Sequence, residues 1–500
     1  MEHDSNLTRR GILQLSATVV AGIATTRGLF TDALAADAAA LDRFQQQKAV
    51  NVKDRILLRG GTIISMDDKV GDLALGDVLI EGKKIVAVAH EINAGGAQVI
   101  DARNMIIVPG LVDCHRHAWE GQLRGINPNS PTLADYGAAT HQSLATAYRP
   151  QDYYVGNYFT AIGCIDAGVT CLIDNSNNSR SAAHSDAAVE ALMDSGLRAI
   201  HASGMPHAGD WEKKWPGDLE RLQKKHFSSK DQLVTLGMYA RIYARDNKDN
   251  WAVARRLGIP ISVEFLDPDM EGILAPLMQQ KLVGPDNIFN HCGGLTEATW
   301  KMIVDSGAHV NVCPRSDAQY GLAEGVCALQ AAWDHGIKPG LSVDNESSYG
   351  GDLFSEMRTA FFVQRALAQN RKFAGDKSPP KPISTRDVLY CATMGGAHCA
   401  GLDDKIGSIA PGKEADLILI RTDDINVFPL NNAVGTVVQA ADRSNVDTVI
   451  IGGRVRKFRG KVVGLDMKRL LAMVDQSRSY LFATKGFSPD LFAEKLPKLN

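Results

Sequence analysis

The sequence has little of what marks several classes of protein. No uninterrupted apolar run reaches about 18 residues, so we expect no permanent membrane-spanning helix. The formal net charge is only −3, from 54 basic and 57 acidic residues, which does not favour binding to nucleic acid or to an anionic membrane. The 8 cysteines include no Cys-x-x-Cys pair, so we predict no disulfide framework and expect small buried apolar residues instead.

What is present is ordinary for a globular enzyme. Hydrophobic residues make up 45% of the 500 residues and charged residues 22%. This length exceeds one average domain, although a barrel of alternating strands and helices can take about 250 residues alone.

The N-terminus carries a candidate export signal over residues 1–35. Arg9 and Arg10 precede a mildly apolar stretch that ends near Ala24, and Ala33-Leu34-Ala35 offers a cleavage site. This order resembles a twin-arginine signal. It predicts a periplasmic or secreted protein, or a cytoplasmic one if the signal is not used. The alternative is an arginine pair that opens an ordinary helix. Since the twin-arginine route carries folded proteins, a metal could be bound before export.

Short apolar runs alternate with longer helical patterns through the middle of the chain. Such alternation is typical of βαβ units and a parallel sheet. Eight runs suit a (β/α)₈ barrel, whose active site lies at the carboxyl ends of the strands. The expected strands are residues 105–112, 170–174, 199–202, 234–238, 261–266, 288–290, 309–313 and 341–343.

The first of these runs leads into His115, Arg116 and His117. Side chains alternate along a strand, so the two imidazoles point to one side and Arg116 to another. Two imidazoles at a strand end can hold a divalent metal such as zinc, iron, cobalt or nickel. The alternative is a pair of histidines that stabilise a loop. Arg116 could meet an anionic group or pair with a nearby acid.

The pattern Pro-Gly-Leu-Val-Asp-x-His-x-His over residues 109–117, with Leu-Arg-Gly at 123–125, decides between these readings. It resembles the first barrel strand of the amidohydrolase superfamily. The branch it most resembles contains cytosine deaminase, the adenosine-type and guanine deaminases, and the triazine hydrolases. The resemblance runs from about Ile56 to Lys468 and implies a TIM-like (β/α)₈ barrel with a small β-sandwich.

In this branch the two terminal segments build the β-sandwich together. Gly-Ser-Ile-Ala-Pro-Gly-Lys-Glu-Ala-Asp at 407–416 is close to the superfamily's wording, and the resemblance makes Lys413 and Asp416 structural rather than catalytic. We expect a composite β-sandwich from residues 51–107 and 404–465 and a metal-dependent hydrolase barrel over 108–403. Residues 466–500 should form a C-terminal helix and tail.

The resemblance also implies ligands on later strands. Asp344 ends the eighth strand and would ligate the metal and act as a base, although an Asp in this place can also be a helix N-cap. His291 lies in Asn-His-Cys-Gly-Gly-Leu-Thr at the end of the sixth strand. It would stand beside the attacking water and the developing oxyanion, unless it is a core histidine.

Strand five departs from the superfamily pattern His-x-His-x-x-Glu. Here the register places Glu264 where the ligand histidine belongs and Asp267 where the proton-carrying glutamate belongs. Glu264 can ligate zinc or iron through oxygen. Two other readings stay open: His291 takes over as the third protein ligand, or the metal site has decayed.

The expected cofactor is one divalent metal, zinc or else iron, cobalt or manganese, because residues 233–240 of strand four offer no bridging Lys or Glu. The metal would lower the pKa of a water molecule. Asp344 would take its proton. Asp267, with His291, would donate a proton and stabilise the charge that forms.

Loops after the first and third strands supply candidate substrate-binding residues, namely Trp119, Gln122, His207 and Trp211. The expected function is hydrolysis of a C–N bond in a small molecule, by deamination of an amino-heterocycle or by amide hydrolysis. The alternatives are a dehalogenase or carbamate-type hydrolase on the same fold, or an exported binding protein with decayed catalysis. A homo-oligomer stays open.

Overall fold

The computed structural model describes residues 54–207, 211, 215–229, 231–244, 246–265, 270–489 and 491–492. The candidate export signal and Asp267 lie outside these residues. Within them a closed parallel barrel adjoins a mixed sheet built from the two ends of the described chain.

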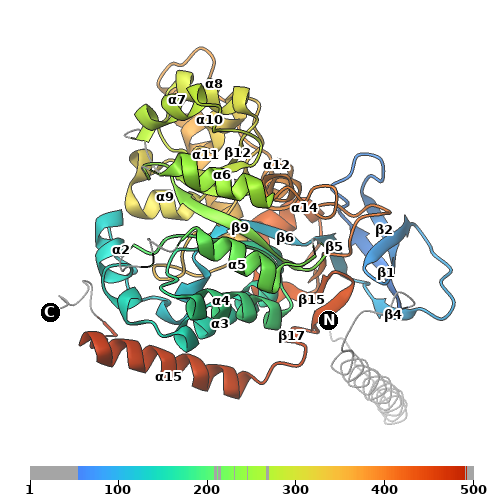
Figure 1. The fold of residues 1–500 in the computed structure, drawn as a ribbon. Coiled ribbons are helices and arrows are strands. Elements are labelled where there is room, and N and C mark those ends of the chain that lie inside the picture. The colour runs from blue at the N-terminus through green and yellow to red at the C-terminus, as the bar shows by residue number, and fades with distance from the viewer. Residues whose placement is uncertain are drawn as a thin grey trace, which may run out of the picture. The chain divides into compact units, whose positions relative to one another are not determined.

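The predicted (β/α)₈ barrel is confirmed: eight parallel strands close in the order β6 to β13, and helices surround them (Figure 1). The strands are β6 (Leu111–Arg116), β7 (Val169–Ser176), β8 (Arg198–Ser203), β9 (Val234–Arg241), β10 (Ile261–Phe265), β11 (Asn287–His291), β12 (His309–Val312) and β13 (Gly340–Leu341). Seven of the expected runs overlap one barrel strand each; the first needs correction.

Residues 105–112 are not one barrel strand, as the sequence predicted, but parts of two strands in different sheets. β5 (Met105–Pro109) pairs with β14 (Leu417–Arg421) outside the barrel, whereas β6 pairs with β7. Gly110 separates them, and a Cβ there would lie 2.0 Å from Thr170 Oγ1. An apolar run cannot reveal this break, because both strands are almost wholly buried.

Nine strands from both ends of the described chain form the second sheet. Figure 1 shows its N-terminal strands in blue beside C-terminal strands in red. Besides β5 and β14 they are β1 (Arg55–Ile63), β2 (Leu73–Glu81), β3 (Lys84–Ala89), β4 (Gln98–Asp101), β15 (Val446–Ile451), β16 (Arg454–Phe458) and β17 (Lys461–Val462). The register joins the two ends directly, since Ile107 of β5 lies opposite Leu419 of β14.

Helices alternate with the barrel strands and cover their outer faces. They are α3 (Pro150–Asp166), α4 (Ala182–Ser195), α5 (Gly217–His226), α6 (Asn247–Leu257), α7 (Glu271–Gln279), α8 (Glu297–Ser306), α9 (Pro314–Tyr320), α10 (Leu329–Asp334) and α11 (Leu353–Phe373). The ends of α4 show what sets the limits of such a helix. Ser181 accepts a hydrogen bond from the His184 amide at its start, and Gly196 adopts a left-handed conformation (φ 73°) at its end.

Shorter helices and the last helix complete the fold. They are α2 (Leu133–Ala139), α12 (Thr385–Tyr390), α13 (Gly396–Cys399), α14 (Ala433–Gly435) and α15 (Met467–Lys485), with 3₁₀ turns such as Ala118–Leu123. α15 packs on α3, where Ser477 Oγ donates to Asp152 Oδ1 at 2.8 Å. Among the described residues no helix has both the length and the apolarity to span a bilayer.

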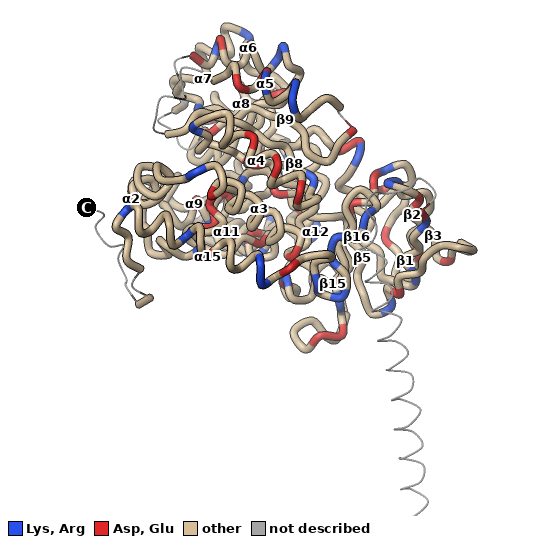
Figure 2. The backbone as a smooth tube through the Cα atoms, turned by 60° about the horizontal axis from the view of Figure 1, so that its bottom comes forward, with Lys and Arg blue, Asp and Glu red and all other residues tan. Residues whose placement is uncertain are grey.

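Apolar side chains fill the inside of the barrel below the strand ends. Val112, Cys114, Cys171 and Ile173 belong to this inner cluster, and all eight cysteines of the chain are buried and unpaired. Acidic and basic residues are interspersed along the described chain (Figure 2). The polar residues with a possible chemical role gather at the carboxyl end of the barrel.

Candidate metal centre

Imidazoles and carboxylates from four barrel strands meet at the carboxyl end of the barrel. His115 Nε2 lies 2.9 Å from Asp344 Oδ1 and 3.4 Å from Glu264 Oε1. His117 Nε2 lies 3.4 Å and 3.9 Å from the same two oxygens. His291 Nε2 lies 3.5 Å from Glu264 Oε2. All five side chains are buried, so the fold brings together every predicted metal and catalytic residue that it describes.

Glu264 tests whether these residues fit a metal. Its side chain is buried, and neither carboxylate oxygen has a hydrogen-bond partner. A buried carboxylate without a partner is costly unless a cation balances it. Ligand atoms of His115, His117 and Glu264 all lie within 4.8 Å of one another. Nitrogen and oxygen ligands at this spacing suit zinc or a similar divalent ion, so the residues fit the metal.

A second set of side chains keeps another reading of strand five open. His115, His291 and Cys313 also bring ligand atoms within 4.8 Å of one another. Burial raises the pKa of the Cys313 thiol, which favours its neutral form. The Cys313 thiol would therefore lose its proton only on binding a metal, whereas Glu264 offers an oxygen ligand directly. Asp267, the predicted proton carrier, lies outside the described residues.

The other ring nitrogen of each histidine is held from outside the cluster. His117 Nδ1 lies 2.9 Å from the Asn175 carbonyl oxygen, and His291 Nδ1 lies 2.7 Å from Asp317 Oδ1. Both contacts place a proton on Nδ1 and aim the lone pair of Nε2 at the cluster. The Asn175 amide faces His115 Nδ1, and its own oxygen has no partner. Turning this amide over would let the oxygen accept an N–H from His115, as ligation through Nε2 requires.

Asp344 is held ionised in a strained conformation. Burial alone would raise its pKa, but the imidazoles of His115, His291 and His117 lower that pKa well below its usual range. Ser316 Oγ donates to its Oδ2, which leaves Oδ1 facing the histidines. Asp344 (φ 72°) and His291 (φ 70°) both adopt left-handed backbone conformations, which are costly for residues other than glycine. The barrel overcomes this cost through hydrogen bonds such as Asp344 N to His115 O at 2.9 Å.

Arg116 points away from the cluster and pairs with acids. Its Nε donates to Asp113 Oδ2 at 2.7 Å and its Nη1 to Glu346 Oε1 at 2.6 Å, all three side chains being fully buried. Of the two roles left open by the sequence, the structure shows pairing with nearby acids. Arg116 thereby ties the end of β6 to the segment after β13, where Asp344 lies.

A hydrogen-bonded group of rings lies beside the cluster. The Trp119 indole Nε1–H donates to Asn177 Oδ1 at 2.8 Å, which fixes the orientation of that amide. Asn177 Nδ2 then lies 3.3 Å from His141 Nε2 and 3.2 Å from His207 Nε2. The His141 ring is 5.9 Å from the His117 ring, centre to centre. Trp119 and His207 therefore both lie beside the candidate metal ligands.

The other two predicted substrate-binding residues, Gln122 and Trp211, have different surroundings. Gln122 is buried, and its amide donates to the Asp152 carbonyl oxygen at 3.0 Å and to Ser477 Oγ at 3.3 Å. These partners belong to α3 and α15, so Gln122 ties two helices together rather than facing the metal ligands. Trp211 is partly buried against the main core.

Sequence reasoning missed His141, Asn177, Ser316 and Asp317. Ser316 and Asp317 follow the seventh strand within Pro-Arg-Ser-Asp at 314–317, so a search for polar residues after every strand would have found them. Asn177 directly follows β7, so the same search would have found it. His141 follows α2 in a long connection, where no sequence period points to a role.

Comparison with known proteins gives the family. The Amidohydrolase family model matches residues 106–456. The chain belongs to this family. Over 447 residues this amidohydrolase is 26% identical to the 5-methylthioadenosine/S-adenosylhomocysteine deaminase of Desulforamulus reducens, covering 86% of this chain and 99% of that protein. It is 27% identical to the 5'-deoxyadenosine deaminase of Methanothermobacter thermautotrophicus over the same shares of both chains.

Solved structures share the fold of this amidohydrolase. An adenosine deaminase from Xanthomonas campestris with bound zinc superposes with a TM-score of 0.74 at 23% identity, covering 86% of this chain and 99% of that one. A mutant atrazine chlorohydrolase from Arthrobacter aurescens, complexed with zinc and atraton, gives a TM-score of 0.74 at 22% identity over 85% of this chain and all of that one.

The family assignment confirms the predicted enzyme class. This amidohydrolase is a metal-dependent hydrolase that acts on C–N bonds other than peptide bonds. Its described residues offer what such a reaction needs at one place: ligands for a divalent ion, an ionised carboxylate and buried imidazoles. A dehalogenating reaction on the same fold is also compatible with the relatives.

Proposed function

We propose that this amidohydrolase removes an exocyclic amine from an amino-heterocycle, with one divalent metal held by His115, His117, Glu264 and Asp344. The observation that carries this proposal is the buried, unpartnered carboxylate of Glu264 between three imidazoles. Relatives named as adenosine-type deaminases support the choice of leaving group. Zinc is the metal we propose, because the solved relatives described above hold zinc.

The chain's own residues divide the work. With a divalent metal held by these residues, a water molecule of lowered pKa would be available as the nucleophile near neutral pH. Asp344 Oδ1, free of the Ser316 hydroxyl, accepts a proton from that water. His291, held by Asp317, keeps its Nε2 beside the reacting centre and stabilises the charge that develops there. Asp267 is proposed to carry a proton to the leaving amine.

Metal content and product release test the proposal together. We expect the purified mature chain to bind about one zinc per chain and to release ammonia from some member of an amino-heterocycle panel. His115→Ala and Glu264→Ala should both lose the metal and the activity, because each removes a ligand. The control is His398→Ala, which changes an exposed histidine paired with Asp403 away from the cluster.

Three outcomes separate the alternatives. Halide released from a haloheterocycle panel, with no ammonia, would replace deamination by dehalogenation. A wild-type enzyme that is fully active after removal of the metal would contradict the proposal. Full metal content in Glu264→Ala with loss in His291→Ala would make His291 the third protein ligand.

We also propose export through the twin-arginine route. Arg9 and Arg10, the apolar stretch and Ala33-Leu34-Ala35 support it. Replacing both arginines by lysine keeps the charge but should hold the protein in the cytoplasm at its full length. Cell fractionation with mass determination of the mature N-terminus measures this, and equal export of both forms would refute it.

A further inference from the structure

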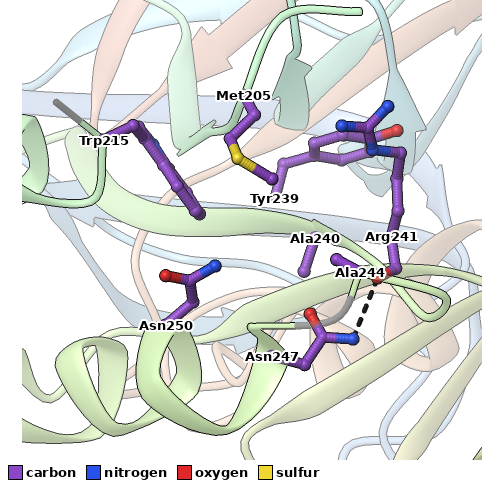
Figure 3. A pocket seen from close by; sticks show the side chains of 8 residues that line it. All are labelled: Met205, Trp215, Tyr239, Ala240, Arg241, Ala244, Asn247 and Asn250. Carbon is purple, nitrogen blue, oxygen red and sulfur yellow. Dashed lines mark hydrogen bonds between the residues drawn. The ribbon is translucent and has the colours of Figure 1, made fainter. Parts of the chain in front are cut away.

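Arg241 ends the fourth barrel strand beside the candidate metal centre. Arg241 and Tyr239 are two residues apart in β9, so their side chains leave the strand on the same side. The Tyr239 ring lies 6.3 Å from the ring of His117, centre to centre. Figure 3 shows the Arg241 guanidinium reaching past the Tyr239 ring, above the small cavity between β9 and α6. Arg241 therefore belongs to the wall of the same barrel mouth.

The backbone at Arg241 is held firmly. Asn247 is buried, and its side-chain Nδ2 donates to the Arg241 carbonyl oxygen at 3.0 Å and to the Ile242 carbonyl oxygen at 2.7 Å. The first of these bonds is drawn in Figure 3. The Ile242 amide donates to the carbonyl oxygen of Glu264 at 3.2 Å. The position of Arg241 is thus tied to the strand that carries a proposed metal ligand.

The guanidinium of Arg241 has no acidic partner in the part of the chain that the structure describes. Among the residues that the structure describes, no carboxylate lies within 4.0 Å of it, although other partly buried arginines such as Arg221 and Arg315 pair with acids. Its contact through Nη1 is with His207 Nδ1, at 3.5 Å. A partly buried guanidinium normally binds a carboxylate or phosphate through two parallel N–H groups. Among the described residues, Arg241 instead has His207 and the Tyr243 ring, 5.6 Å away, beside its guanidinium.

The proton of His207 faces the same gap. Asn177 is oriented by Trp119, so its Nδ2 donates toward His207 Nε2, which must accept. The neutral ring then carries its proton on Nδ1, which points at Arg241 Nη1. In this tautomer the two N–H groups face each other, and among the described residues no carboxylate lies between them. Burial and the charge of Arg241 lower the pKa of His207 to about 3, so the ring stays neutral.

We propose that Arg241 and His207 form an anion subsite that binds a carboxylate group of the substrate, with the reacting carbon held at the metal centre. A carboxylate oxygen beside the two nitrogens can accept from both, and the guanidinium supplies the balancing charge. A single guanidinium and one neutral imidazole match one negative charge better than a phosphate dianion. The inference deepens the proposed function and depends on it for the location of the reacting centre.

Chemical labelling of Arg241 tests the subsite without any turnover. Phenylglyoxal reacts with accessible arginines, and peptide mapping gives the labelling rate of each one. Benzoate at about ten times its Kd should slow labelling of Arg241 by about tenfold, because protection follows the fraction of sites occupied, whereas benzamide at equal concentration and ionic strength should not. Labelling of Arg256, which is exposed and paired with Glu220, should not change with either compound and serves as the internal control. Equal effects of benzoate and benzamide on Arg241 would overturn the proposal.

Two variants separate this subsite from the metal site. In His115→Ala, protection by benzoate should persist, because the carboxylate is held by Arg241 rather than by the metal; its loss there would overturn the subsite while leaving the proposed deaminase intact. His207→Leu should weaken the protection of Arg241. Among carboxylate and carboxamide pairs of amino-heterocycles, Arg241→Met should raise KM for the carboxylates by about 10- to 100-fold and leave kcat and the carboxamides unchanged. Arg256→Met, the matched control, should change neither, and a wild type that prefers the carboxamides would refute the inference.

Discussion

Glu264 is the residue that sets the proposed metal site apart from the superfamily pattern. A carboxylate ligand in place of an imidazole adds negative charge at the metal, so the same ion becomes a weaker Lewis acid. Both oxygens of Glu264 are buried without a donor, and the three histidines around it direct ring nitrogens toward them. The site therefore contains more negative charge than two histidines and one aspartate would provide.

Substitutions of Glu264 should change the metal affinity and the pH dependence of activity in predictable directions. Glu264→His should keep zinc, because imidazole nitrogen is a ligand of equal denticity, and should shift the pH–rate profile to lower pH, because less negative charge surrounds the metal. Glu264→Gln should weaken zinc binding by at least about 10- to 100-fold, the loss known for removing even an outer partner of a ligand. Competition with a zinc-binding dye measures both affinities. Equal affinity in Glu264→Gln and the wild type would rule out Glu264 as a ligand.

Strand β6 depends on the glycine that precedes it. Gly110 lies between two strands of different sheets, and its amide donates to the Asp416 carbonyl oxygen at 2.9 Å. A Cβ at this position would lie 2.0 Å from Thr170 Oγ1 and 2.3 Å from Thr170 Cγ2 on β7. The first barrel strand can start beside its neighbour only if this residue has no side chain.

Gly110→Ala should therefore destabilise the protein by overpacking, by about 1–3 kcal/mol or more. Urea denaturation followed by tryptophan fluorescence measures the free energy of unfolding. Gly95→Ala is the matched control, since a Cβ there meets nothing within 4 Å. If Gly110→Ala were as stable as Gly95→Ala, β7 would be able to move away from the added Cβ without a loss of unfolding free energy.

Helices α4 and α5 are joined through one carboxylate. Asp186 on α4 pairs with Arg221, Lys225 and His226 on α5 at 2.7–2.8 Å. Burial raises the pKa of Asp186, but hydrogen bonds from Lys225, Arg221 and His226 and the charge of Arg221 outweigh it and bring the pKa to about 2. Because the folded pKa lies below the unfolded one, the stabilisation is present above about pH 4 and is lost as pH falls toward 2.

The stability difference between the wild type and Asp186→Asn should follow that window. It should be constant from about pH 7 to pH 5 and shrink as the pH falls below 4, because protonation of Asp186 then removes the charge from both states. Thermal unfolding across this range measures it, with Asp475→Asn on the exposed surface of α15 as control. A stability difference between the two proteins that grows as the pH falls would contradict this prediction.

The sequence predicted a helix or strand correctly where a single local pattern was enough to identify it. Seven barrel strands were marked by short apolar runs between helical patterns, and His115 and His117 were placed on one side by alternation alone. The break at Gly110 was not predictable, because it depends on Thr170 in another strand. Asn177 and Trp119 likewise meet only after the barrel closes, since 58 positions separate them. Contacts of this kind leave no period in the sequence.

At the scale of the whole molecule, the terminal sheet and the barrel share a buried ion cluster. Arg198, at the start of β8, donates from Nε to Asp416 Oδ2 at 2.8 Å and from Nη2 to Glu414 Oε2 at 2.6 Å. All three side chains are at most 6% exposed. Asp416 also accepts from the Gly452 amide at 2.8 Å, next to β15 of the sheet. One arginine of the barrel thus neutralises two acids of the segment that enters the sheet.

Arg198→Met should cost about 3–5 kcal/mol of unfolding free energy, because it leaves the buried carboxylate of Asp416 without a paired cation. Glu414 keeps only the longer contacts with Lys83 and Lys84, at 3.7 and 3.9 Å. Arg256→Met, which breaks an exposed pair with Glu220, should cost less than about 1 kcal/mol. Adding Glu414→Gln and Asp416→Asn to Arg198→Met should recover part of the loss, since no uncompensated charge then remains. Unfolding by urea, followed by circular dichroism, gives the three values. A loss in Arg198→Met no larger than in Arg256→Met would mean that water reaches the cluster, and that the sheet is held to the barrel by apolar contacts alone.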